Sequence, residues 1–409
     1  MLVCAPLTAL LGIAHCAVQT RLERVVAYSS VENAGLICVG FAIALVGATT
    51  GDERLVAVGL LAGLLQAVAH AFAKSLLFVT TGAIELTTET TELDALRGIG
   101  RRLPWAGTGL GVGAVTLAGL PPTIGFASEW FLLEALMQQF RVGNLAMALG
   151  MAFAGALVAL TAGFASVAFV RIVGLTVLGP IRHVPVPTSR LFGLGIPGRF
   201  AVILLGLGCL GIAAVTPLEI RVLAAGVSDI VPASVTLGAL KSPWVVQPVY
   251  PDFSILSPSW LWVVMPAIFA ALLLVATAAS RGGLWRVRRT HPWLSATGGV
   301  EGVDQYTPFG YANPTRRVLA NLLRTRTQVR PHAVAGGGEH DGAPHAGTSL
   351  GYSSDVVEVV EEYLYRPLGR PLRSIVAAAK RFQSGRIDAY LAYMLIALVA
   401  VIAIVVVVS

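Results

Sequence analysis

Residues 66–78 read QAVAHAFAKSLLF, an apolar run that carries one histidine and one lysine. His70 and Lys74 are four residues apart, so on a helix they lie one above the other on the same face. An ionisable side chain at membrane depth costs free energy, and it is therefore a functional-site candidate by default. Fold and function must both account for this pair.

The composition places this run in a membrane protein. Of the 409 residues, 56% are hydrophobic and only 12% are charged, whereas a soluble domain has about 25% charged residues. The predicted fold is all-α, a polytopic helical bundle in the membrane. Apolar runs near the roughly 20 residues that cross a bilayer as a helix predict spans at 2–19, 26–48, 55–84, 104–140, 144–178, 199–217, 258–279 and 388–408.

The basic residues indicate topology. Lys and Arg concentrate in the segments 20–25, 85–103, 179–198 and 280–387, and the positive-inside rule places these segments on the cytoplasmic side of a cell membrane. The net charge of +7 therefore does not indicate nucleic-acid binding. All four cysteines fall inside predicted spans, without CxxC or metal-ligand spacing. We expect no disulfide, no metal site and no cofactor in this chain.

A helix break is predicted within residues 104–140, which are too long for one plain span. Residues 120–125 read LPPTIG, and two prolines remove backbone donors and clash with the preceding turn. Broken helices at membrane depth line cavities and ion pathways, and Glu129 follows this break. Glu134 is expected to face a neighbouring helix. Arg171, near the end of its span, is expected to extend to the interface.

Two readings stay open for the buried charges. Glu32 lies inside the second span and needs a partner or a proton, so it is either a relay residue or half of a structural ion pair. Lys74 either exchanges protons with His70 or is permanently paired with a carboxylate. We favour the relay for Lys74, because a purely structural pair would not need His70 one turn away.

The regions outside the spans offer little chemistry. Residues 218–257 are predicted to be an outside loop with no chemical role. Residues 331–350 are rich in Gly and His, and we interpret them as a linker in preference to a metal site. Residues 355–387 have an amphipathic pattern that suits a helix lying along a surface.

Three ordered motifs resemble the proton-pumping subunits of complex I and their relatives in Mrp cation/proton antiporters and membrane-bound hydrogenases. The motifs are QTRLERVVAYSS at 19–30, HAFAKSLLF at 70–78 and LPPTIGFASE at 120–129. Within this family, residues 30–33 and 128–130 and the tail at 383–394 look most like the component B branch of hydrogenase-4 and formate hydrogenlyase. The resemblance covers essentially the whole sequence, weakly over 218–257 and 290–350.

The resemblance implies a function and assigns residues to it. It implies a membrane-arm subunit that translocates protons for a larger oxidoreductase, with the redox centres in other, hydrophilic subunits. Lys74 would be the central lysine, His70 its relay neighbour and Glu129 the charged residue on the broken helix. Arg21 and Glu23 stand where the family usually has Asp and Lys, so an ion pair of reversed sense is expected in the cytoplasmic turn. The alternatives are a cation/proton antiporter component and a non-conducting scaffold or truncated subunit.

The resemblance also implies a division of the chain. Residues 1–178 match only the second of the family's two inverted five-helix repeats, so a complete entry channel is not expected from this sequence alone. The remaining parts are two further spans with an outside loop at 179–279, a polar and partly disordered cytoplasmic loop at 280–354, a lateral amphipathic helix at 355–387 and a terminal span at 388–409.

Overall fold

Two units make up the protein, Met1–Leu319 and Ala320–Ser409, and each is described by itself. The computed structural model describes residues 1–178, 194–242, 244–250, 257–279, 307–333, 348–358, 360–382 and 387–408. Among these residues, five helices are long and apolar enough to cross a membrane. The prediction of a helical membrane bundle is confirmed.

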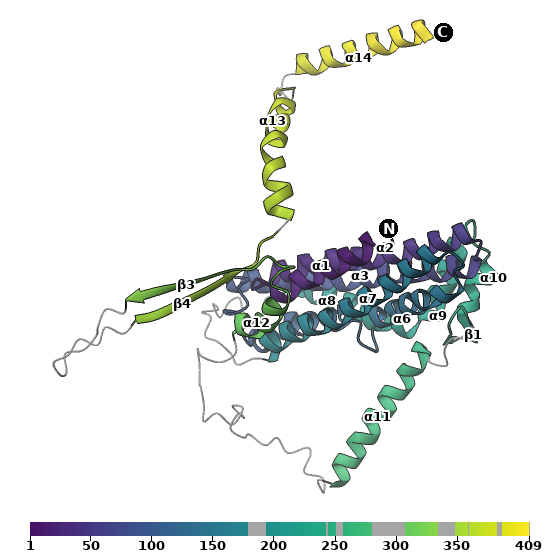
Figure 1. Ribbon diagram of the computed structural model, residues 1–409, viewed down its shortest axis with the longest axis vertical. Coiled ribbons are helices and arrows are strands. Elements are labelled where there is room, and N and C mark those ends of the chain that lie inside the picture. Colours follow the sequence, from purple (N-terminus) through teal and green to yellow (C-terminus); the bar gives the residue numbers. More distant parts are fainter. Residues whose placement is uncertain are drawn as a thin grey trace, which may run out of the picture. The chain divides into compact units, whose positions relative to one another are not determined.

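The first unit is built from helices, most of which pack side by side (Figure 1). Its helices are α1 (Cys4–Val18), α2 (Leu22–Thr50), α3 (Glu53–Thr88), α4 (Ile99–Arg102), α5 (Pro104–Leu117), α6 (Ile124–Leu136), α7 (Leu145–Ile172), α8 (Ile196–Ala214), α9 (Thr216–Gly226), α10 (Ala233–Thr236), α11 (Pro258–Ala279) and α12 (Pro308–Val318). A 3-10 turn, Met137–Arg141, follows α6, and a π-helical turn, Val173–Leu178, extends α7. Strands β1 (Leu240–Ser242) and β2 (Val245–Val246) pair antiparallel.

A tight turn joins α2 to α3. Gly51 ends α2 with a φ of +71°, a left-handed conformation that glycine adopts without strain. The side chain of Asp52 then accepts hydrogen bonds from two backbone N–H groups in the first turn of α3, which otherwise lack partners. The two helices pack closely, because a Cβ built on Gly40 would lie 2.5 Å from the backbone nitrogen of Gly63. Small residues thus let the α2 and α3 backbones touch.

The predicted break lies between α5 and α6. Helix α5 ends at Leu117 and α6 begins at Ile124, on either side of Pro121 and Pro122. Gly119 has a φ of +61°, so the chain turns sharply before the prolines. The prediction of a helix broken over 120–125 is confirmed, because the signals that stop a helix are local in sequence.

The described apolar core of the first unit contains two large clusters and two small ones. On α2, one cluster ends at Val26 and the other begins at Leu36. On α3, the second cluster ends at Leu65 and the first begins at Ala73. Three buried polar residues of α2, Ser29, Glu32 and Asn33, lie between these limits. On α3, Gln66 and Lys74 lie between the limits or at their edge, whereas four buried threonines lie beyond Ala73. The core therefore contains a polar layer between the two large apolar clusters. Its residues are Ser29, Glu32, Asn33, Gln66, His70, Lys74, Ser128 and Glu129.

The region 218–257 has more structure than a loop. Helix α9 ends at Gly226, and α10 and the β1–β2 pair follow it. Val246, Val249 and Tyr250 are buried in the second apolar cluster. The sequence predicts an outside loop here, and in the described residues of this region apolar side chains pack against the bundle.

The second unit contains a β-hairpin and two helices. Strands β3 (Arg326–Ala333) and β4 (Thr348–Asp355) pair antiparallel, and the sequence analysis did not predict them. A π-helical turn, Glu361–Tyr365, leads into α13 (Arg366–Phe382), and α14 (Ile387–Val408) follows. Most of the His-rich segment, residues 334–347, lies outside the described residues.

Candidate functional site

Lys74 is the centre of the polar layer. Its side chain is 6% exposed, and Nζ donates hydrogen bonds to Val26 O and Ser29 Oγ, both at 2.6 Å. The ring of Phe78 lies 6.0 Å away. Among the described residues, Lys74 makes no ion pair. The ammonium is thus held by neutral oxygens, and the permanent-pair reading has no support in the described part of the chain.

Hydrogen bonds link Lys74 to the broken helix through two atoms of Ser29, because Lys74 donates to its hydroxyl and Asn33 donates to its backbone oxygen. Asn33 Nδ2 donates to Ser29 O at 2.9 Å, and Gln66 Nε2 donates to Asn33 Oδ1 at 2.7 Å. Ser128 Oγ, on α6, donates to Gln66 Oε1. All five residues are buried. The chain therefore connects α2, α3 and α6 across the interior of the bundle.

The sequence analysis missed this chain, although its spacing was visible. Ser29 and Asn33 are four residues apart on α2, as Gln66, His70 and Lys74 are on α3. Spacing of four places each set on one helix face. What the spacing could not show is that the two faces meet.

Glu32 is a buried carboxylate on α2, one residue before Asn33. It is 1% exposed, and its Oε2 has no hydrogen-bond partner among the described residues. The charges of Glu129 and Lys74 both act on it. Glu32 is therefore placed to interact with the central lysine and with the carboxylate of the broken helix.

Glu129 lies against the break. Its side chain is half-buried, and a Cβ built on Gly119 would collide with its carboxylate. A side chain with a Cβ at this position would require the Glu129 carboxylate to move. The break therefore determines where Glu129 lies.

His70 lies one turn before Lys74 and is half-buried. Its Nδ1 has no hydrogen-bond partner among the described residues, and no hydrogen bond joins it to Lys74 there. The charge of Lys74 nevertheless acts on His70.

Arg21 and Glu23 lie outside the polar layer. Arg21 Nε is 2.6 Å from Glu23 Oε1 and 3.6 Å from Glu92 Oε1. Both side chains of the closer pair are partly exposed, 44% and 33%. Exposed pairs of this kind contribute about 0–1 kcal/mol to stability.

Arg171 does not extend to the interface. It is 1% exposed, and its Nη2 donates to Gln19 O at 2.6 Å. Arg316, on α12, donates to Val18 O at 2.7 Å. The expectation for Arg171 was wrong, because the last carbonyl groups of α1 accept its hydrogen bond inside the bundle, as helix C-terminal carbonyls do with cationic groups.

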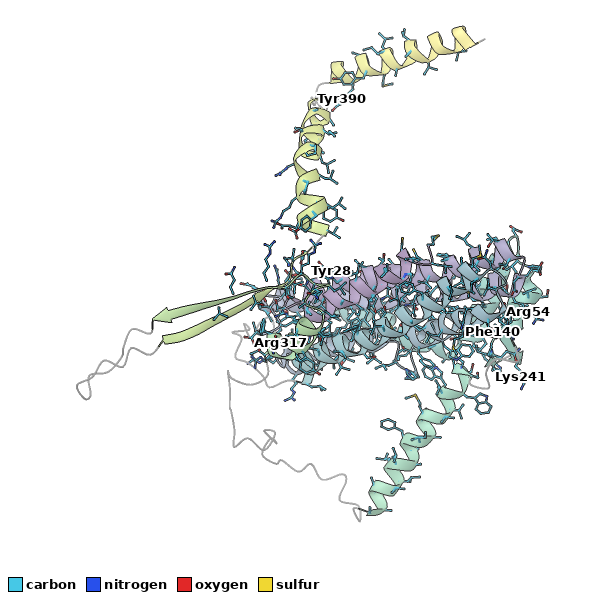
Figure 2. The ribbon with its side chains drawn as sticks, in the orientation of Figure 1. Tyr28, Arg54, Phe140, Lys241, Arg317 and Tyr390 are labelled. Carbon is cyan, nitrogen blue, oxygen red and sulfur yellow. The ribbon has the colours of Figure 1, made fainter. Side chains whose placement is uncertain are left out.

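The polar layer lies inside the bundle, between its two ends. Figure 2 places Tyr28 toward one end of the first unit and Arg54 toward the other. His15 stacks on Tyr28 with ring centroids 5.2 Å apart. The layer is thus a candidate internal pathway, and nothing in its described geometry resembles a nucleophile with its base or a metal site.

The chain is similar to membrane subunits of known proteins. Residues 1–157 match the family described as NADH:quinone oxidoreductase/Mrp antiporter, TM. Hydrogenase-4 component B of Escherichia coli (strain K12) is 27% identical over 401 residues, covering 95% of this chain and 56% of the relative. Formate hydrogenlyase subunit 3 of the same organism is 27% identical over 347 residues, covering 84% of this chain and 53% of the relative. The chain thus spans about half the length of these curated relatives.

A solved structure shares the fold. One chain of the membrane-bound sulfane sulfur reductase, an archaeal respiratory membrane complex, superposes with a TM-score of 0.54 at 20% identity. The superposition covers 98% of this chain and 55% of that chain. The resemblance drawn from the three sequence motifs is confirmed.

Proposed function

We propose that this chain, a relative of the antiporter-like membrane subunits of complex I-type and hydrogenase-type complexes, translocates protons through its polar layer. The observation that carries the proposal is the hydrogen-bonded chain from Lys74 to Ser128, enclosed between two apolar clusters. Buried polar groups in a membrane bundle are costly, and they are retained where ions or protons pass.

Lys74 is the switch in this proposal. Its ammonium is held by a backbone carbonyl and a serine hydroxyl, and both can also accept from a neutral amine. Loss of the proton therefore leaves the contacts of Lys74 in place. A lysine locked to a carboxylate would lose an ion pair on deprotonation, which would oppose exchange.

Glu32 carries the proton between Lys74 and Glu129 in this scheme. It is affected by the charges of both groups, so a change at either end alters its tendency to hold a proton. Ser29 and Ser128 can donate and accept at once, whereas Asn33 and Gln66 fix the orientation of the chain. His70 exchanges protons with Lys74 from the adjacent turn.

The proposal also includes the partner subunits of the chain and its location in a membrane. The relatives named above belong to multi-subunit membrane complexes, and the described residues contain no group of metal ligands. We place the redox cofactors in hydrophilic partner subunits and the chain in the cell membrane. Arg21 and Glu23 belong to the cytoplasmic surface in this arrangement.

Proton flux in liposomes tests the function. The full chain is reconstituted, a potassium gradient with valinomycin sets the membrane potential, and an enclosed dye reports pH. We expect flux above that of protein-free liposomes in sodium-free buffer, and at least a tenfold loss of it in Glu32→Gln. Flux that needs sodium would favour a cation/proton antiporter. Liposomes no leakier than protein-free ones would favour a scaffold.

A further inference from the structure

A second buried carboxylate lies on α6, beyond Glu129. Glu134 is 3% exposed, and neither of its carboxylate oxygens has a hydrogen-bond partner among the described residues. Its helical neighbours Phe131, Leu132 and Ala135 all belong to the second apolar cluster. A carboxylate in these surroundings costs several kcal/mol if it stays charged and unpaired. Helix packing gives no reason to retain it.

A segment distant in sequence covers Glu134. The backbone N–H groups of Val249 and Tyr250 face its carboxylate, without completing a hydrogen bond of normal geometry. Tyr250 is itself 3% exposed. The segment at 244–250, for which the sequence indicated no chemistry, thus closes over the buried acid.

Tyr250 lies between the surroundings of the buried Glu134 carboxylate and the partly exposed Asp52. Its hydroxyl donates to Asp52 Oδ2 at 2.8 Å, and Asp52 is partly exposed at the start of α3. A tyrosine hydroxyl can donate and accept hydrogen bonds, so it can orient water between two carboxylates. A buried acid, a tyrosine and a partly exposed acid therefore follow one another toward the end of the bundle.

Arg141 completes the outer cluster, defined as Glu134, Tyr250, Asp52 and Arg141. Its guanidinium lies 4.8 Å from the centroid of the Tyr250 ring. Its Nε also donates at 2.9 Å to Gln138, whose amide donates at 3.2 Å to the backbone oxygen of Glu134. Arg141 is exposed. Its positive charge favours the ionised form of nearby carboxylates.

The outer cluster lies at the end of the bundle remote from Tyr28. Figure 2 shows Arg54 and Phe140 at this end, and these residues are close in sequence to Asp52 and Arg141. The polar layer lies between the two ends. Glu134 is five residues beyond Glu129 on the same helix, so it lies farther along α6 in the direction of the Arg54 end.

We propose that Glu134 exchanges protons between the polar layer and the water at the Arg54 end of the bundle, with Tyr250 and Asp52 as positioning residues. In the releasing step, the O–H bond of protonated Glu134 breaks and an O–H bond forms on a water molecule, which passes a proton to the carboxylate of Asp52. No electrons are transferred. The direction of transport rests on the proposed function, whereas the exchange at Glu134 does not.

Infrared spectroscopy tests the exchange directly. The full chain in liposomes is transferred from H2O to D2O, and the C=O band of protonated carboxyl groups is followed in time. The band missing from Glu134→Gln is assigned to Glu134. We expect it to shift within seconds in the wild type and at least tenfold more slowly in Asp52→Asn. Asparagine caps a helix as well as aspartate does, so this variant keeps the start of α3. It removes the ionisable group together with the oxygen that accepts from the Tyr250 hydroxyl.

Flux measurements separate this inference from the proposed function. We expect Glu134→Gln to lower proton flux at least tenfold, while Glu219→Gln, which alters a carboxylate on α9, keeps wild-type flux. If Lys74→Met stops flux but Glu134→Gln conducts normally, the inference is overturned and the proposed function stands. If the wild type conducts nothing but the Glu134 band exchanges fast and slows in Asp52→Asn, the proposed function fails and the exchange stands. A Glu134 band that is absent, or equally fast in Asp52→Asn, overturns the inference.

Discussion

At the scale of single residues, the charged groups of the polar layer have incomplete sets of ion pairs and hydrogen bonds among the described residues. Lys74 is held by Val26 O and Ser29 Oγ, with no ion pair among the described residues. Glu32 has one carboxylate oxygen without a hydrogen bond there. Charged groups with complete ion pairs would not exchange protons, because each would hold its partner in one protonation state. Incomplete satisfaction is what allows a proton to move.

Gly119 gives a prediction at this scale. We expect Gly119→Ala to lower proton flux, because its Cβ would displace the carboxylate of Glu129. The left-handed φ of +61° adds a loss of about 1–2 kcal/mol for a residue with a Cβ. The matched control is Gly111→Ala in α5, where a Cβ would meet open space and stability should rise by about 0.5–1 kcal/mol. Unchanged flux in Gly119→Ala would contradict the position assigned to Glu129.

At the scale of elements, an unbroken helix faces a broken one. Helix α3 runs from Glu53 to Thr88 through the whole polar layer, whereas α5 and α6 are separated by the turn at Gly119. The unbroken helix holds Lys74 rigidly. The broken helix brings the ionisable end of Glu129 beside free backbone, which is tolerated at membrane depth only inside protein or along a cavity.

The anchoring of α1 gives a prediction at this scale. Arg171→Ala removes the hydrogen bond to Gln19 O and leaves a cavity, so we expect a loss of at least about 2 kcal/mol in the free energy of unfolding. Arg101 is the control, since it donates a bond of the same length to Leu178 O but is exposed. Arg101→Ala should stay within about 0.5 kcal/mol of the wild type. Denaturant unfolding in detergent measures both, and equal effects would contradict the role of burial.

How much the sequence revealed also depends on the element. Lys74, His70 and the break at Pro121–Pro122 were found because each signal is contained within one or two helical turns. The bonds from Gln66 to Asn33 and Ser128 join residues 33 and 62 positions apart, and Arg171 reaches Gln19 across 152 positions. No local pattern states which helix faces meet. Glu134 and Tyr250 were dismissed for the same reason.

At the scale of the whole molecule, the first unit is organised around a polar layer that divides its apolar core. Many apolar side chains on the outside are exposed, including Leu149, Phe153 and Leu160 on α7. Such a surface suits lipid or neighbouring membrane subunits. The bundle is therefore apolar on much of its outside. Its interior contains the polar layer and also two large apolar clusters.

The stability of the whole molecule should decline with rising pH. Burial raises the pKa of Glu219 from 4.5 to about 8, so the folded state binds the proton more tightly than the unfolded state. Its contribution is complete below about pH 4.5 and is lost as pH rises through about 8. The full shift corresponds to about 5 kcal/mol, which the partial exposure of Glu219 reduces. Thermal unfolding in detergent between pH 5 and pH 8 should show a flatter profile for Glu219→Gln. Parallel profiles for the two proteins would contradict the assignment.

The central claim is that protons cross the first unit through Lys74. The most direct measurement is proton flux in liposomes that contain Lys74→Met, beside the control Lys241→Met, which alters an exposed lysine of the β1 strand. The account predicts that Lys74→Met falls to the level of protein-free liposomes while Lys241→Met conducts as the wild type does. Wild-type flux in a folded Lys74→Met would contradict it.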